Sequence, residues 1–90
     1  MLMRFTVEQR HLTDMNGKPL PNAGEVTFQT YDAESIEDLV KRYVRGDGEA
    51  EILGDVLKFP GFQAFLTVRK PSGVYTVQIT LASQQGLRVP

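Results

Sequence analysis

The chain of 90 residues carries 10 Lys and Arg against 11 Asp and Glu, with one His, no Cys and no Trp. This length corresponds to one small domain, which has little structure with which to enclose a deep pocket. We therefore do not expect an elaborate enzyme site. The lack of cysteine excludes a disulfide framework, a thiolate zinc site and a cysteine nucleophile, and it fits a reducing cytosol.

The N-terminal residues lack the basic stretch and apolar run of a secretory signal, and no apolar run approaches the roughly 20 residues that span a bilayer. We therefore expect a cytoplasmic protein with no membrane association. Charge is unevenly distributed, since residues 25–55 carry nine acids and three bases whereas residues 56–90 carry four bases and no acid. The acid-free final third is the clearest charge asymmetry in the chain.

Two strands are predicted at the start of the chain. Residues 4–12 alternate with period two, with Phe5 and Val7 on one side and polar residues on the other. A concentration of turn-forming residues over 13–24 predicts a long loop. Residues 25–31 resume β-branched and aromatic residues, and we expect this second strand to pair with the first.

A helix is predicted over residues 33–45, about 20 Å long. Asp32 is predicted as its N-cap, and Gly46 as a left-handed cap at its C-terminal end. Apolar residues recur at i, i+3, i+4, i+7 and i+8, so that the helix is amphipathic and lies across one face of a sheet. This stripe consists of Ile36, Leu39, Val40, Tyr43 and Val44.

Three more strands are predicted after the helix. The third covers residues 50–59 with a bulge at Gly54. The last two form a hairpin over residues 62–81, joined through Pro71 and Ser72 by a type I turn with a bulge at Gly73. The order ββαβββ predicts an α+β domain over residues 1–82, with one helix on an antiparallel sheet of four to five strands, followed by a weakly ordered tail over 83–90.

The sheet face that points away from the helix is the predicted functional surface. Its composition leaves two interpretations open: an ordinary solvated face with Phe65 under a loop, or a contact surface for a partner. We predict the contact surface, used for homo-oligomerisation or for binding another protein. If the last strand were also an exposed edge, it would pair with its symmetry mate. The outward residues of the hairpin are Gln63, Phe65, Thr67, Arg69, Val74, Thr76, Gln78 and Thr80, of which Phe65, Thr67, Arg69, Thr76 and Gln78 are our candidate contact residues.

Two aromatic residues flank a Pro-Gly turn at residues 58–62. Phe59, Pro60 and Phe62 could form a rigid hydrophobic tip for a partner, because the constrained backbone leaves little entropy to lose on binding. The alternative is that the two rings cap the core at the ends of adjacent strands.

The alternative function is nucleic-acid or small-ligand binding by the acid-free hairpin. Lys58, Arg69, Lys70 and Arg88 lie among aromatic residues there and could contact phosphates. A pI of about 5.7 and the lack of any RNP, KH or helix-turn-helix pattern argue against nucleic acid.

Enzyme motifs are missing. The only imidazole, His11, falls in phase with the apolar side of the first strand and is interpreted as a satisfied, partly buried side chain. No serine lies in a nucleophile elbow, the glycines fit turns, and the acidic residues lack EF-hand spacing. We therefore predict no catalytic residue, no cofactor and no metal.

Residues 13–28 are similar to the D-x-x-G-x-P-L-P…V-x-F strand-loop-strand of extracellular transthyretin-like and Ig-like repeat domains. A predicted helix follows this segment, and the later T-D-x-x-G-x-F/Y motif of those domains is missing. We interpret the resemblance as convergent turn chemistry and transfer neither fold nor function from it.

Overall fold

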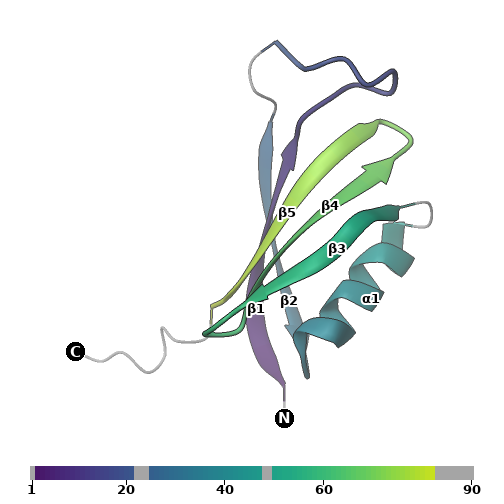
Figure 1. The fold of residues 1–90 in the computed structure, drawn as a ribbon. Coiled ribbons are helices and arrows are strands. Elements are labelled where there is room, and N and C mark those ends of the chain that lie inside the picture. Colours follow the sequence, from purple (N-terminus) through teal and green to yellow (C-terminus); the bar gives the residue numbers. More distant parts are fainter. Residues whose placement is uncertain (1, 22–24, 48–49, 83–90) are drawn as a thin grey trace.

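A computed structural model of the chain describes residues 2–21, 25–47 and 50–82. Five strands and one helix follow one another in the order ββαβββ, which confirms the α+β class (Figure 1). The predicted tail over 83–90 lies outside the described residues. No helix in the described part of the chain is long and apolar enough to cross a membrane. The elements are β1 (Met3–His11), β2 (Val26–Ala33), α1 (Ile36–Asp47), β3 (Glu51–Phe59), β4 (Gln63–Lys70) and β5 (Gly73–Leu81).

The five strands form one antiparallel sheet in the order β2-β1-β5-β4-β3. The predicted pairing of the first two strands is confirmed. The last strand, β5, lies at the centre between β1 and β4, so it offers no edge to a symmetry mate. The two edges are β2 and β3, and the chain passes from one to the other through α1 (Figure 1).

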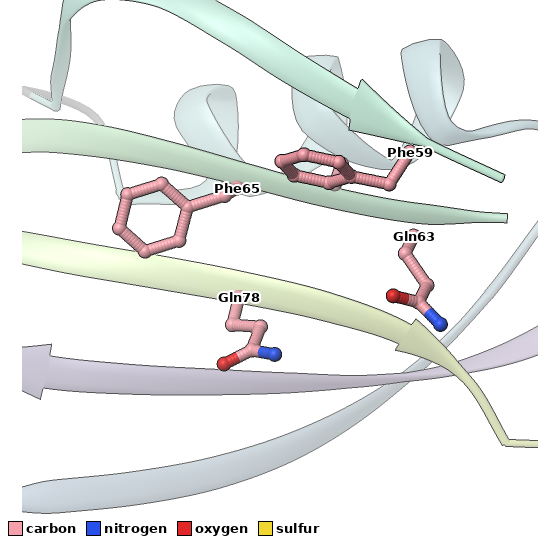
Figure 2. A pocket seen from close by; sticks show the side chains of 5 residues that line it. Phe59, Gln63, Phe65 and Gln78 are labelled. Atoms are coloured by element: carbon pink, nitrogen blue, oxygen red, sulfur yellow. The ribbon is translucent and has the colours of Figure 1, made fainter.

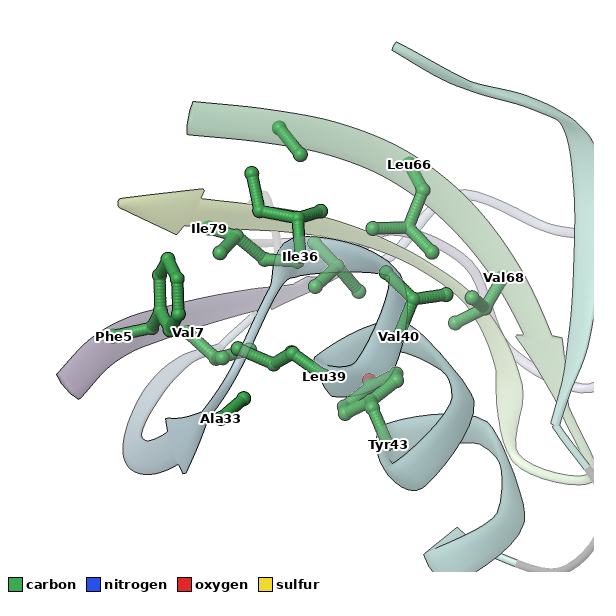
Figure 3. Packing of buried hydrophobic residues seen from close by; sticks show 12 residues of the cluster. Phe5, Val7, Ala33, Ile36, Leu39, Val40, Tyr43, Leu66, Val68 and Ile79 are labelled. Atoms are coloured by element: carbon green, nitrogen blue, oxygen red, sulfur yellow. The ribbon is translucent and has the colours of Figure 1, made fainter. Parts of the chain in front are cut away.

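One face of the sheet packs against α1 (Figure 3). Four of the five residues in the predicted helix stripe are buried there, and Val44 is half-buried against the same cluster. Alternate residues of β1, β4 and β5 supply the sheet side, as their period-two pattern predicts. The buried core consists of Phe5, Val7, Ala33, Ile36, Leu39, Val40, Tyr43, Ala64, Leu66, Val68, Val77 and Ile79.

Both predicted helix ends are wrong. The helix begins at Ile36, and its N-cap is Ser35, whose Oγ accepts the N–H of Asp38 at 3.0 Å. Asp32 instead continues β2 opposite Arg4, because pairing with β1 holds that segment extended. At the other end the helix continues through Gly46 to Asp47, so Gly46 is helical and not a left-handed cap.

The bulge predicted in the third strand is confirmed. Gly54 has φ +79, and the β3–β4 register shifts between Leu53 and Leu57. Both leucines nevertheless lie opposite outward-facing β4 residues, Thr67 and Phe65. The bulge therefore leaves the residues on its two sides facing the same way.

The last hairpin turns at Pro71 and Ser72 as predicted, but without a bulge, because the register continues unshifted to Lys70 opposite Gly73. Gly73 is required for a different reason. Its φ is +138, and a Cβ there would lie 1.9 Å from the carbonyl oxygen of Thr13. The loop after β1 is fastened at this point, since the N–H of Val74 donates to Thr13 Oγ1 at 3.1 Å.

Candidate functional site

The sheet face opposite the helix is the candidate site, and we call it the outer face. Among the predicted contact residues, Phe65 lies opposite Gln78 and Thr67 opposite Thr76, with Arg69 next along β4. Alternate residues of the same strands are buried in the core, so these five side chains share the outer face. The outer face comprises Arg4, Thr6, Glu8 and Arg10 of β1, Val26, Phe28, Thr30 and Asp32 of β2, Glu51, Leu53, Leu57 and Phe59 of β3, Gln63, Phe65, Thr67 and Arg69 of β4, and Val74, Thr76, Gln78 and Thr80 of β5.

An apolar corner lies where β3 joins the hairpin. Leu57 is directly opposite Phe65, and Phe59 is opposite Gln63. Leu57 and Phe59 are 51% and 50% exposed, and Phe65 is half-buried. The position of Leu57 was not predicted, although the spacing of four residues between Leu53 and Leu57 across a bulge is a signal for it.

A hollow of about 340 Å³ opens beside this corner. Phe59 and Phe65 contribute rings, and Gln63 and Gln78 contribute side-chain amides at its rim (Figure 2). Phe65 therefore faces an open hollow and is not under a loop of the described chain. Rings beside amides suit a partner that brings an apolar side chain together with a hydrogen-bonding group.

The charged side chains of the outer face are paired with one another. Arg4 donates to Asp32 at 3.0 Å, and further pairs join Arg69 to Glu51 at 3.0 Å and Arg10 to Glu8 at 3.8 Å. The hydrogen bond from Arg4 is the main reason why the pKa of Asp32 lies below its ordinary value, and the carboxylate raises the pKa of Arg4 in turn. Three bases thus face three acids, and the outer face is close to neutral.

This pairing bears on the nucleic-acid alternative. Arg69 is bound to Glu51, and Lys58 forms an ion pair with Glu37 of the helix. Lys70 lies on the helix side of the sheet, and Arg88 lies outside the described residues. Two of the four bases in the acid-free segment therefore form ion pairs with acids of β3 and α1.

The turn between β3 and β4 carries two exposed rings. Phe59 and Phe62 are 50% and 51% exposed, so the alternative in which both cap the core is wrong. Phe62 has φ +59, a conformation that bulky residues rarely adopt. Phe59 lines the hollow of the outer face, and together with Phe62 it also lines a second groove of about 390 Å³ against the start of α1, near Ile36. Pro60 is exposed between them. The predicted tip thus lies between two surfaces, and Phe59 contributes to both of them.

A polar and aromatic cluster lies on the helix side, beyond the core. His11 stacks on Tyr75 with ring centroids 4.1 Å apart, and its Nε2 lies 3.1 Å from the carbonyl oxygen of Ser72. The interpretation of His11 as a satisfied side chain is confirmed. Lys70 Nζ lies 5.0 Å and 4.8 Å from the ring centroids of Tyr43 and Tyr75, a contact that was not predicted. The sequence signal for this contact is that Lys70 alternates in phase with the buried residues of β4 and therefore points to the helix side. The cluster attaches the end of α1 to the sheet.

Three or more His, Asp or Glu side chains do not gather into a possible metal site within the described ranges. Comparisons with protein-family models, with curated proteins and with solved structures gave no match. The outer face is therefore interpreted from its own geometry.

Proposed function

We propose that this domain is a non-enzymatic module for protein–protein contact, and that its partner on the outer face is a second copy of the same chain. The observation that supports the proposal is the apolar corner of Leu57, Phe59 and Phe65. Three large apolar side chains lie together on a sheet face that no described helix or strand crosses (Figures 1 and 2). Contiguous exposed apolar groups of this kind mark interaction sites.

The electrostatics of the face favour a second copy over nucleic acid. Two neutral faces meet without net repulsion, and the ion pairs already formed within each face leave few cations for phosphates. The alternative of a nucleic-acid or small-ligand binder has less support, because its bases Lys58 and Arg69 are paired. A cytoplasmic location is part of the proposal on the ground of the cysteine-free composition.

The expected affinity is modest. Full burial of a Leu or Phe side chain contributes about 1.5–3 kcal/mol, so covering the exposed halves of Leu57 and Phe59 in both copies contributes about 3–6 kcal/mol. A micromolar complex requires a binding free energy of about 8 kcal/mol. Contacts of the threonines, the glutamines and Phe65 must supply the remainder and must also offset the entropy that is lost on association. We therefore expect association in the micromolar to millimolar range.

The test is the solution mass of the Phe65→Glu variant by sedimentation equilibrium, at chain concentrations from about 10 μM to 1 mM. Met15→Glu is the matched control, because Met15 is an exposed apolar side chain on the loop after β1, away from the outer face. We expect the mass of Phe65→Glu to fall below that of the wild type, while Met15→Glu follows the wild type. An unchanged mass for a folded Phe65→Glu protein contradicts the proposal.

A further inference from the structure

Within the described part of the chain, the middle of the edge strand β2 carries none of the features that prevent pairing with another strand. Eight residues of β2 pair with β1 in continuous register, and the sheet ends there. Residues 26–31 include no charge, no Pro and no Gly, and residues 27–30 are all exposed. Natural proteins protect free edges with charges, prolines or bulges.

The opposite edge, β3, shows such protection. Gly54 introduces a bulge, Asp55 follows it, and Lys58 forms an ion pair with Glu37 of the helix. The two edges of the same sheet thus differ, and the unprotected one is rich in β-branched and aromatic residues. This difference makes β2 the edge that is suited to pairing with another strand.

Two hydrogen bonds identify which main-chain groups of β2 face outward. The carbonyl oxygen of Glu25 accepts the N–H of His11 at 3.0 Å, so the main-chain groups of Glu25 point toward β1. Because direction alternates along an antiparallel ladder, residues 26, 28, 30 and 32 point their N–H and C=O groups to the free edge. The carbonyl of Asp32 agrees with this, since it accepts a hydrogen bond from Arg42 of the helix. Arg42 closes that end, whereas no hydrogen bond from the described residues occupies the outward main-chain groups of Val26, Phe28 and Thr30.

We infer that β2 pairs antiparallel with β2 of a second copy, about a two-fold axis at Phe28. In this register Phe28 lies opposite Phe28 of the other copy, and Val26 lies opposite Thr30. All three open residues then form hydrogen-bonded pairs, and Asp32 stays outside the paired segment. No like charges face each other, and the two phenyl rings form a cross-strand aromatic pair.

This pairing explains the exposure of Phe28, which at 65% is high for a large apolar residue in a strand. It also joins the two sheets into one, with the outer faces of both copies on the same side. The edge contact uses main-chain groups and side chains of β2, whereas the proposed outer-face contact uses the apolar corner on β3 and β4, at the opposite edge of the sheet. The two contacts are therefore independent, and either can hold without the other.

The first test is a pair of double variants made in the Phe65→Glu background, in which the outer-face contact is disabled. Val26→Glu with Thr30→Lys places opposite charges across the inferred pair twice, and Val26→Glu with Thr30→Glu places like charges there. Both change the same two positions, so differences in folding are minimised. We expect Phe65→Glu alone and the opposite-charge variant to have the mass of two chains at high concentration, and the like-charge variant to dimerise at least about tenfold more weakly.

The second test is amide hydrogen exchange of the wild type at low and high concentration. The N–H groups of Phe28 and Thr30 should become protected as concentration rises, whereas those of Thr27 and Gln29, which point to β1, should be protected throughout. A single-chain mass for Phe65→Glu at every concentration overturns the inference. Equal dimerisation of the two double variants, or protection of Phe28 and Thr30 that does not depend on concentration, also overturns it. If the outer-face contact does not exist, Phe65→Glu has the same solution mass as the wild type. That outcome differs from every result that overturns the pairing of β2.

Discussion

The Gly73→Ala variant tests how the loop after β1 is held on the sheet. A methyl group at this position would lie 1.9 Å from the carbonyl oxygen of Thr13 and 2.9 Å from that of Asp14. Both neighbours are backbone atoms, so a side-chain rotation cannot relieve the overlap. The loop must move away from the start of β5, or the hairpin must distort.

The magnitude follows from the strain and from the hydrogen bonds at this junction. An L-residue held at φ +138 carries about 1–3 kcal/mol of strain. Moving the loop disturbs three hydrogen bonds of Val74: its N–H with Thr13 Oγ1, and its carbonyl oxygen with the N–H of Leu12 at 2.8 Å and of Thr13 at 3.3 Å. Each such bond contributes about 0.5–1.5 kcal/mol. We expect the free energy of unfolding to fall by about 2.5–7.5 kcal/mol, a large part of the roughly 5–13 kcal/mol typical of a chain this long.

Urea unfolding followed by far-ultraviolet circular dichroism measures this loss. With a urea m-value of about 1–3 kcal/mol/M for a small domain, a decrease of this size lowers the midpoint by roughly 1 M or more. Gly17→Ala is the matched control: Gly17 also has a positive φ, +82, but nothing lies within 4 Å of its hypothetical Cβ. It should lose only about 1–2 kcal/mol from the left-handed conformation. If both variants lose the same amount, the contact between Gly73 and Thr13 does not restrict the loop as we argue.

Two further predictions concern the junction between β2 and α1. Ser35→Ala should lower the free energy of unfolding by about 1 kcal/mol through loss of the N-cap, measured by urea unfolding, whereas Asp32→Ala should leave the helix content unchanged by circular dichroism; a loss of helix in Asp32→Ala alone would contradict the assignment of Ser35. The second prediction is that the pKa of Asp32 lies below that of an ordinary aspartate, because Arg4 donates to its carboxylate. A lowered pKa in the folded state stabilises the protein above the ordinary aspartate pKa, and this contribution disappears as the pH falls through the lowered value. Carboxyl carbon chemical shifts should show the low midpoint in the wild type and a higher one in Arg4→Gln, and identical midpoints would refute the interaction.

Local patterns predicted most of the elements because each strand carries its own alternation. Val68 and Ile79 faced the core as expected, and Gly54 marked the bulge through its own conformational freedom. The outward phase of Phe65 and Gln78 also followed from alternation within one hairpin. These features depend on residues close in sequence, so they can be read without knowing the strand order.

The errors arose where distant segments compete for the same residues. Asp32 has the chemistry of an N-cap, but β1 lies beside it and extends β2 by pairing with it, so the helix starts at the next suitable residue, Ser35. Gly73 was assigned to a bulge from local turn rules, whereas the loop around Thr13 imposes the glycine from outside the hairpin. Local propensity predicts structure poorly where a tertiary contact contributes more free energy than the local preference does.

Strand order had the largest consequence for the functional proposal. Nothing local distinguishes a central strand from an edge strand of similar composition, and β5 and β2 are both rich in Val, Thr and aromatic residues. The sheet order places β5 at the centre, where neighbouring strands satisfy its main chain, and leaves β2 at the edge with the same β-prone composition and no charge over residues 26–31. A strand at the edge of a sheet has open main-chain groups. An uncharged, β-prone composition does not prevent other strands from pairing with them. A homotypic partner for β2 would satisfy those groups with residues that the chain itself supplies. The sheet order leaves two edges, β2 and β3, and the uncharged composition of β2 then identifies the edge where a second copy should bind.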